Sequence, residues 1–312
     1  MKKTLLTILF LLSLILSGCV TQVAVCGEGL IEVDGICTSI DNEEDPDDND
    51  PNPISACNTT TSDYGVSNFD LVWNDEFDYN GQLDSTKWEY MIGNGGAYGI
   101  PGWGNGELQY YTNDQDNVLV SDGKLTITAS TNGFAQYGYT SGRIRSMGMG
   151  DFRYGIIEVC AQLPTTLGTW PAIWMLPTNS PYGGWPTGGE IDIMEAVGYE
   201  SNTIHFNIHT KNDNWGTSQS IGSYSNISNI GGQYHAYAIL WDQFQIEFYV
   251  DGQLHFTYRP VQYTYEYWPF DSDFHLLLNI AVGGSWGGAR GVQDGPWEDS
   301  MFVDYVRVYQ ER

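Results

Sequence analysis

Basic residues are scarce in this chain. Its 312 residues include 12 lysines and arginines against 39 aspartates and glutamates, which gives a formal net charge of −27. The imbalance is not confined to one end, because residues 55–312 alone hold 29 acidic and 10 basic residues, a net charge of −19. Nucleic acids and anionic membranes attract basic surfaces, so the charge excludes a nucleic-acid partner and argues against direct binding to anionic lipid.

Helical periodicity, internal repeats and clusters of metal-binding side chains are also lacking. No long stretch places apolar residues at helical spacing, and no repeat of propeller or solenoid length is visible. His205 and His209 are four residues apart, but no other histidine or cysteine pair accompanies them. A zinc site needs more ligands than that, so the sequence predicts none.

Short β-rich runs separated by turn residues make up the chain from about residue 68 onward. "KLTITAS" at 124–130 follows a Ser-Asp-Gly turn and alternates apolar with polar residues, as does "MFVDYVRVYQ" at 301–310. "FQIEFYVDGQLHFTY" at 244–258 has the pattern of a hairpin around Asp251-Gly252. This organisation predicts an all-β domain, either an antiparallel sandwich or a barrel.

The N-terminus has the features of an export signal. Lys2 and Lys3 precede an apolar run over residues 5–16 that is too short for a mature membrane helix. "LSGC", which ends at Cys19, resembles a bacterial lipobox and implies cleavage after residue 18 and lipidation of Cys19. The alternative is an ordinary signal peptide with an unrelated cysteine. We predict an exported protein, lipid-anchored at the bacterial cell surface or outer membrane, with the membrane and leaflet left open.

Four of the five cysteines remain once Cys19 is assigned, an even number in an oxidising compartment. Cys26 and Cys37 bracket a short hairpin pattern, and we expect them to form a disulfide. Cys57 and Cys160 either pair or leave Cys160 as a buried free thiol. Residues 41–53 hold seven acidic and no basic residues, which predicts a disordered spacer. The domains expected are therefore a signal peptide (1–18), an anchored Cys-containing segment with its spacer (19–57) and a main domain (58–312).

The stretch "GGEIDIMEAVG" at 188–198 places three carboxylates within an otherwise apolar strand. Side chains alternate along a strand, so Glu190 and Asp192 share one face while Glu195 would lie on the other. An extra residue at Ile193–Met194, a β-bulge, returns Glu195 to the first face. Two glutamates leaning together at about 5 Å would suit a retaining glycosidase. The alternative is a strand with a solvated acidic face.

The surrounding sequence resembles glycoside hydrolase family 16, in the bulged form found in laminarinases. The resemblance covers most of residues 69–309. It includes, in order, "LVWNDEFDYNGQLDSTKWEY", "GWGNGELQYYT", "YTSGRI", "YGIIEVCAQLP", "GTWPAIWMLP", "AYAILWDQFQIEFYVDG", "LLLNIAVGGSWGG" and "MFVDYVRVYQ". It implies a jelly-roll β-sandwich with a substrate cleft on its concave face, and a catalytic domain over residues 58–312.

The resemblance also implies roles for individual residues. Glu190 matches the nucleophile, Glu195 the general acid/base and Asp192 the assisting carboxylate. The expected substrate-binding residues are Trp103, Asn105, Glu107, Arg143, Trp170, Trp174, Trp185, His209 and Trp286. Each of these could instead serve packing, since aromatic rings commonly fill β cores.

A structural calcium ion away from the cleft is a further implication of the family. Main-chain oxygens near Glu76 and Gly123 and an oxygen of Asp304 occupy the matching positions, and oxygen ligands suit calcium. Alternatively, Asp304 caps a strand end or pairs with Arg307. No cofactor is expected for catalysis.

The resemblance predicts a retaining endo-hydrolase of β-1,3-glucan, with activity on mixed-linkage β-1,3-1,4-glucan left open. The partner is then the polysaccharide, and a monomer is expected. The alternative from another class is a non-catalytic glucan-binding protein at the cell surface. Both catalytic glutamates are present, which favours the enzyme.

Overall fold

The computed structural model describes residues 30–33, 36–39, 55–213 and 221–312, in two compact units over residues 1–52 and 53–312. In the first unit, β1 (Leu30–Val33) pairs antiparallel with β2 (Ile36–Ser39) as the predicted hairpin. Cys19, Cys26 and the acidic spacer lie outside the described residues, so lipidation and the Cys26–Cys37 disulfide stay predictions. In the described ranges, no helix is both long and apolar enough to cross a membrane.

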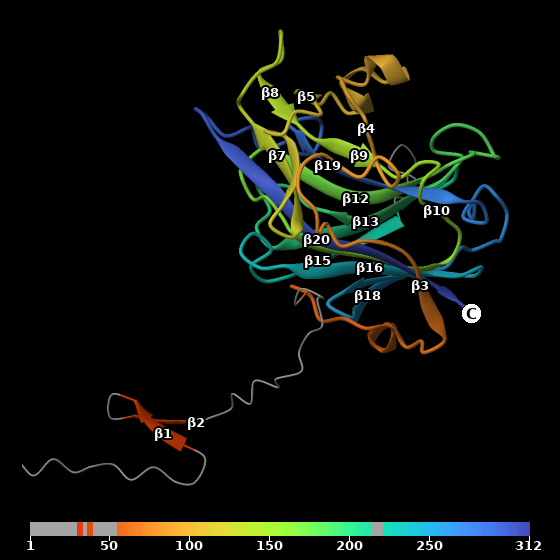
Figure 1. Ribbon diagram of the computed structural model, residues 1–312. Helices are drawn as coiled ribbons and strands as arrows, with labels where there is room; N and C mark the ends of the chain where they lie inside the picture. The colour runs from red at the N-terminus through yellow and green to blue at the C-terminus, as the bar shows by residue number, and fades with distance from the viewer. Residues whose placement is uncertain (1–29, 34–35, 40–54, 214–220) are drawn as a thin grey trace, which may run out of the picture. The chain divides into compact units, whose positions relative to one another are not determined.

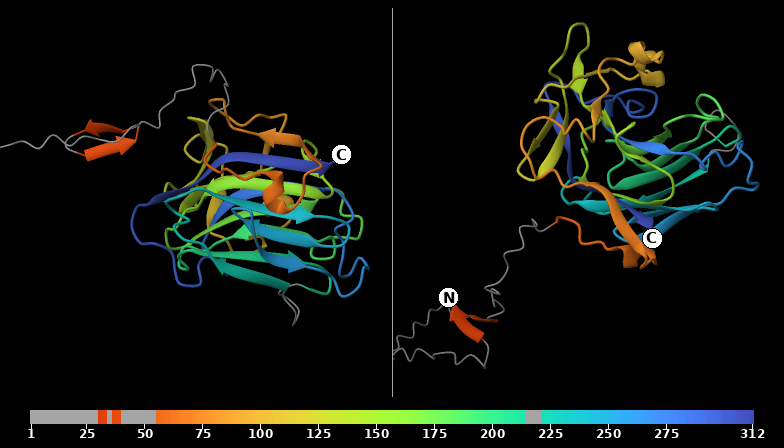
Figure 2. Two further views of the ribbon diagram at one scale, coloured as in Figure 1. Left: turned by 90° about the horizontal axis from the view of Figure 1, so that it is seen from below. Right: turned by 45° about the vertical axis from the view of Figure 1, so that its right-hand side comes forward.

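The second unit is built from two stacked sheets, which confirms the predicted sandwich (Figures 1 and 2). In spatial order, the eight-stranded sheet contains β15 (Ile221–Asn226), β14 (Thr203–His209), β13 (Glu190–Glu195), β12 (Thr169–Pro177), β19 (Phe274–Val282), β9 (Arg143–Arg145) and β4 (Glu89–Tyr90), with β10 (Asp151–Phe152) paired to β19.

The other sheet has ten strands and carries the opposite outer face of the sandwich. In spatial order it contains β18 (Gln253–Tyr258), β17 (Ile246–Val250), β16 (His235–Trp241), β11 (Gly155–Gln162), β20 (Glu298–Glu311), β7 (Lys124–Ser130), β8 (Tyr139–Ser141) and β5 (Gln109–Tyr111), with β3 (Phe69–Asp75) paired to β20 and β6 (Val118–Ser121) to β7. The helical elements of the described residues are the short 3-10 segments η1 (Thr61–Tyr64), η2 (Gly96–Tyr98) and η3 (Pro101–Gly104).

The hydrophobic core lies between the sheets and follows from the alternation of the strands. In β7, Leu125, Ile127 and Ala129 are fully buried while the intervening residues are half-buried. Strand β19, "FHLLLNIAV", is buried at every position. Its inner face joins the core, and side chains from neighbouring elements cover its outer face, so the strand needs no polar alternation. The acidic strand β13 belongs to the same sheet and is separated from β19 by β12.

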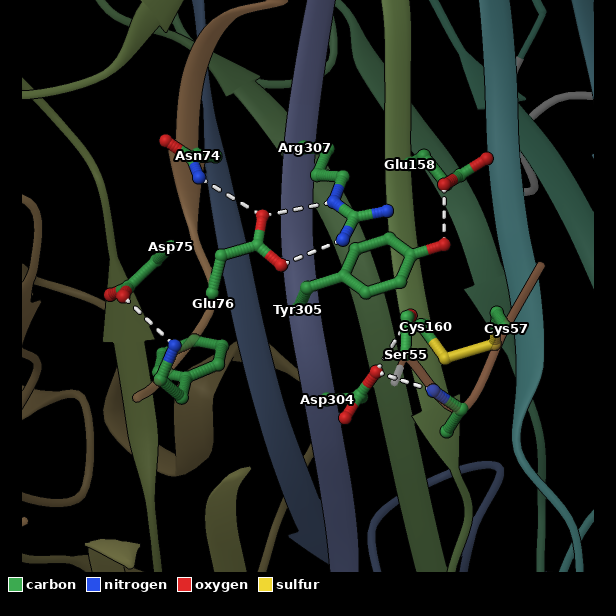
Figure 3. A network of polar contacts seen from close by, with 12 residues as sticks. Ser55, Cys57, Asn74, Asp75, Glu76, Glu158, Cys160, Asp304, Tyr305 and Arg307 are labelled. Carbon is green, nitrogen blue, oxygen red and sulfur yellow. Dashed lines mark hydrogen bonds and ion pairs between the residues drawn. A yellow bond between two sulfur atoms is a disulfide. The ribbon is translucent and has the colours of Figure 1, made fainter. Parts of the chain in front are cut away.

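The outer face of the ten-stranded sheet carries a polar network that fastens the start of the domain (Figure 3). Glu158 in β11 is buried and accepts hydrogen bonds from Thr59 Oγ1 (2.8 Å), Tyr305 OH (2.6 Å) and Tyr64 OH. Cys57 forms a disulfide with Cys160, which settles the pairing that the sequence left open. The segment from Cys57 to Tyr64 is thereby attached to two central strands of the sheet.

Removing the Cys57–Cys160 disulfide should lower the stability of the domain. The two cysteines are 103 residues apart, so the bond restricts the unfolded chain strongly. We expect the Cys57→Ser/Cys160→Ser double variant to lose about 2–5 kcal/mol of unfolding free energy, measured by denaturant titration. With reductant, the unfolding free energy of the wild type should fall toward that of the variant. Reductant should not change the contribution of this site in the variant, which lacks the bond. Equal stability of the two proteins would contradict the expectation.

Candidate active site

The acidic strand β13 contains the predicted bulge. Its register against β14 pairs Asp192 with Asn207 and Glu195 with His205, so three steps along β13 match two steps along β14. The register against β12 shifts at the same place. The extra residue lets Ile193 and Met194 both be fully buried in the core. The bulge therefore puts Glu195 on the same face as Glu190 and Asp192, as the spacing of the motif predicted.

The three carboxylates are packed into a site with few counter-charges. Asp192 and Glu195 are 3% and 8% exposed, and Glu190 is half-buried. His209 Nε2, on β14, lies 3.2 Å from Asp192 Oδ2 and 3.8 Å from Glu190 Oε1. The contact between His209 Nε2 and Asp192 Oδ2 is not a hydrogen bond. Asp192 Oδ2 is therefore buried without a hydrogen-bond partner among the described residues. Glu190, Asp192 and His209 have donor types that a cation can bind. We assign them no metal, because carboxylate-based glycoside hydrolysis requires none.

Burial controls the protonation of this cluster. It raises the pKa of Glu190 well above its ordinary value, and the charge of Asp192 adds to the effect while His209 and Arg143 oppose it. Burial and then the charge of Glu195 raise the pKa of Asp192 well above its ordinary value. Burial also raises the pKa of Glu195. Three carboxylates so placed cannot all ionise together, so the cluster keeps a proton where an unburied set would be fully ionised.

Two strands adjacent to β13 contribute hydrogen-bond donors to Glu195. Trp170 in β12 donates its Nε1 proton to Glu195 Oε1 (2.9 Å), and Asn207 in β14 donates from Nδ2 to Oε2 (2.7 Å). The Trp170 ring meets Trp286 edge-on with ring centroids 5.4 Å apart, and Trp286 meets His205 at 4.8 Å. Trp170 and Trp286, predicted to bind sugar, thus lie together next to the acid/base candidate.

Arg143, in β9, lies at the centre of a second group of predicted residues, which come from the sheet and from η3 and the segment after it. It is buried, and its guanidinium lies over the rings of Trp103 (4.3 Å) and Trp174 (4.8 Å). Burial lowers the pKa of Arg143, and its attraction to Glu107 and Glu190 opposes the effect. Such an arrangement holds a donor-rich cation close to Glu190.

Glu107 joins this second group to β19 through a chain of hydrogen bonds. Asn105 Nδ2 (3.2 Å), Gln109 Nε2 (2.7 Å) and Tyr111 OH (3.4 Å) all donate to the Glu107 carboxylate. Tyr111 OH in turn accepts from Asn279 Nδ2 (3.2 Å). Asn279 Oδ1 accepts a hydrogen bond from Trp174 Nε1 (2.9 Å) in β12, so this series of hydrogen bonds ends on β12. The structure therefore brings Trp103, Asn105, Glu107, Arg143 and Trp174 into one connected wall.

A cavity of about 240 Å³ lies beside the end of β13 that carries Glu190. Gly188 and Gly189 directly precede Glu190 and line it together with Trp185, Arg145 and other residues. Trp185 is 56% exposed and its ring centroid is 5.9 Å from that of His209, so both predicted residues lie at this end of the site. A larger cavity of about 670 Å³ is lined by Cys57, Tyr234 and their neighbours and includes none of the predicted site residues.

The sequence reasoning missed several side chains of the site, namely Asn207, His205, Gln109, Tyr111 and Asn279. A signal for two of them was present in "TIHFNIH" at 203–209, where polar His205, Asn207 and His209 alternate with buried Ile204, Phe206 and Ile208. Such alternation places three polar groups on one face of a strand. The sequence alone does not show that this strand pairs with β13, so the pattern does not assign these residues to the site.

The three predicted calcium positions lie close together along the main chain, but the Glu76 side chain is bound elsewhere. Strand β20 has Val306 opposite Asp75 and Val303 opposite Leu125, so the chain at Glu76 and at Gly123 approaches the same point near Asp304. The Glu76 carboxylate, however, is held by Arg307 at 2.9 and 2.8 Å (Figure 3).

Among the described residues, Asp304 contacts the start of the domain at Ser55 and Ala56. Its Oδ2 accepts hydrogen bonds from Ser55 Oγ (3.0 Å) and the Ala56 amide (2.9 Å). Arg307, the alternative partner, is bound to Glu76. Any ion here would therefore depend on main-chain carbonyls and the remaining Asp304 oxygen, a ligand type that calcium accepts.

Comparisons with known proteins place this geometry in a family. The family model "Glycosyl hydrolases family 16" matches residues 105–306. This chain belongs to that family. It is 42% identical over 267 residues to a β-glucanase from Rhodothermus marinus, covering 82% of this chain and 91% of the relative. It is 39% identical over 299 residues to glucan endo-1,3-β-glucosidase A1 from Niallia circulans, covering 86% of this chain and 41% of the relative.

A solved structure of the family has the same fold. The X-ray structure of the laminarinase from Rhodothermus marinus superposes with a TM-score of 0.74 at 41% identity, covering 78% of this chain and 98% of that one. The predicted family 16 membership and the jelly-roll sandwich are therefore confirmed. This family 16 protein is a glycoside hydrolase, and members of the family need no catalytic cofactor.

Proposed function

We propose that this family 16 protein is a retaining endo-β-1,3-glucanase. The observation that carries the proposal is the bulged strand β13, which aligns Glu190, Asp192 and Glu195 on one face between donors from β12 and β14. Paired carboxylates are the machinery of glycoside hydrolysis, and the relatives named above act on β-glucan. The complete catalytic set disfavours the glucan-binding alternative.

The proposed reaction has two steps. Glu190 attacks the anomeric carbon of the bound sugar, while Glu195 donates its proton to the departing oxygen. Water then enters from the vacated side, Glu195 removes its proton, and the sugar–Glu190 bond breaks. Asp192 lies on the same face between the two glutamates, and burial and the charge of Glu195 raise its pKa, so in this proposal it holds a proton while Glu190 is ionised.

Laminarin with the purified domain gives the direct test. We expect release of new reducing ends, with a mixture of oligosaccharides at early times because cleavage is internal. The same assay with mixed-linkage β-1,3-1,4-glucan compares the two rates of release and so shows how strictly the residues around Arg143 select the linkage. Binding of laminarin without release of reducing ends would favour the glucan-binding function instead.

We also propose that the enzyme acts as a monomer at the cell surface, lipid-anchored through Cys19. The support is the lipobox-like sequence that ends at Cys19. Cys19→Ala should release the enzyme to the soluble fraction or block its processing, as measured by membrane fractionation. A processed Cys19→Ala protein that still sediments with membranes would contradict the lipid anchor.

A structural calcium ion at the Glu76, Gly123 and Asp304 positions is the third part of the proposal. The convergence of the main chain at β20 supports it. An ion that binds only the native state stabilises it, so chelator should lower the melting temperature of the wild type. Asp304→Ala should melt lower and respond less to the chelator. An unchanged melting temperature in both experiments would argue against the ion.

A further inference from the structure

Each oxygen of the Glu195 carboxylate accepts one N–H bond, and the donors come from opposite sides of β13. Trp170 Nε1 in β12 donates to Oε1, and Asn207 Nδ2 in β14 donates to Oε2. Neither an indole N–H nor an amide NH₂ can accept a proton in return. A proton on Glu195 therefore has no acceptor in these two partners.

The position of the Asn207 amide depends on Gly222 in the neighbouring strand β15. The two residues are opposite one another in the register. A Cβ atom at residue 222 would lie 2.2 Å from Asn207 Oδ1 and 2.6 Å from the main-chain oxygen of Phe206, closer than real side chains approach. Gly222 is not among the glycines with positive φ, so its backbone does not require glycine. The glycine provides space for that main-chain oxygen and for the amide oxygen of Asn207, whose Nδ2 faces Glu195.

The charged and titratable groups around Glu195 are few. Glu190 and Asp192 lie on its own strand, and His205 and His209 lie on β14. Strand β12 contributes the uncharged Trp170. Burial raises the pKa of Glu195, and the hydrogen bond from Asn207 is the largest opposing influence, ahead of that from Trp170.

We propose that Asn207 is a positioning residue that stabilises the ionised form of Glu195, the form that acts as general base in the second step, and that Gly222 keeps the amide in place. The inference rests on the proposed retaining mechanism and deepens it. Loss of the amide should slow the base-dependent release of the sugar more than the formation of the glycosyl-enzyme.

The test uses a laminaribioside with a 2,4-dinitrophenyl leaving group, because such a substrate makes the second step limiting for kcat. With Asn207→Ala, kcat should fall about tenfold or more and KM should fall with it, while kcat/KM changes little. The acidic limb of the kcat profile, where Glu195 has to be ionised, should move up by about one to two pH units. Asn207→Asp, of nearly equal size but without the donor, should shift the limb at least as far.

A second variant displaces the Asn207 side-chain amide without removing it. Gly222→Ala should shift the same limb in the same direction, whereas Asn226→Ala, on the same strand but bonded to Thr203, should leave the profile unchanged. Unshifted limbs in Asn207→Asp and Gly222→Ala, with kcat and kcat/KM reduced equally, would overturn the role of Asn207. A wild type that cleaves no β-glucan would instead remove the proposed function itself.

Discussion

Replacing Glu190 by alanine should abolish hydrolysis of laminarin, and azide should restore turnover of an aryl β-laminaribioside with an α-glycosyl azide as product. Without Glu190 no glycosyl-enzyme forms, so the small anion occupies the space of the missing carboxylate and attacks from that face. A single inversion converts the β-glycoside into the α product. The measurement is the anomeric proton coupling of the azide product by NMR.

The matched control for this variant is Glu190→Gln, which fills the space that azide needs. It should be inactive on laminarin and poorly rescued. A β-glycosyl azide from Glu190→Ala would show that another group is the nucleophile. Full hydrolysis of laminarin by Glu190→Ala would remove Glu190 from the mechanism.

Glu195→Ala should fail in a different way. With an aryl substrate that has a good leaving group, the first step needs no acid and Glu190 still forms the glycosyl-enzyme. Azide then attacks the intermediate from the opposite face and gives the β-glycosyl azide. With laminarin, whose leaving group is a sugar, the rate should fall by about 10²–10⁴-fold because general acid catalysis is lost.

The pH dependence gives an independent check on Glu195. Burial raises its pKa, so the acid form persists to higher pH than for an ordinary glutamate, and kcat/KM on laminarin should fall only above that raised pKa. In Glu195→Ala, kcat/KM on the activated aryl substrate should lose this basic limb.

Azide products exchanged between the two variants would keep the retaining mechanism but exchange the roles of Glu190 and Glu195.

The bulge in β13 could be predicted from the sequence because two local rules required it. Glu190, Asp192 and Glu195 fit one face only with an extra residue, and Ile193 and Met194 are both apolar and need burial. The registers against β12 and β14 confirm the position. Alternation within each strand also sufficed to predict the all-β class.

Contacts between distant segments could not be predicted in the same way. Substrate binding by Trp170 stays a prediction, whereas the hydrogen bond from its indole to Glu195 depends on the register between β12 and β13, which the sequence does not show. Asn207 was missed because nothing in its own segment specifies the neighbouring strand. The Cys57–Cys160 pairing depends on a contact between β11 and the segment that precedes η1, 103 residues apart in the sequence, which no local pattern encodes.

The central claim is that Glu190 and Glu195 act as a retaining pair on a β-1,3-glucan. The most direct measurement is the NMR spectrum of the first reducing end released from laminarin by the wild type, recorded before mutarotation. Two inversions at the anomeric carbon predict the β anomer as the initial product, with the α anomer rising later. An α anomer as the first product would contradict the account.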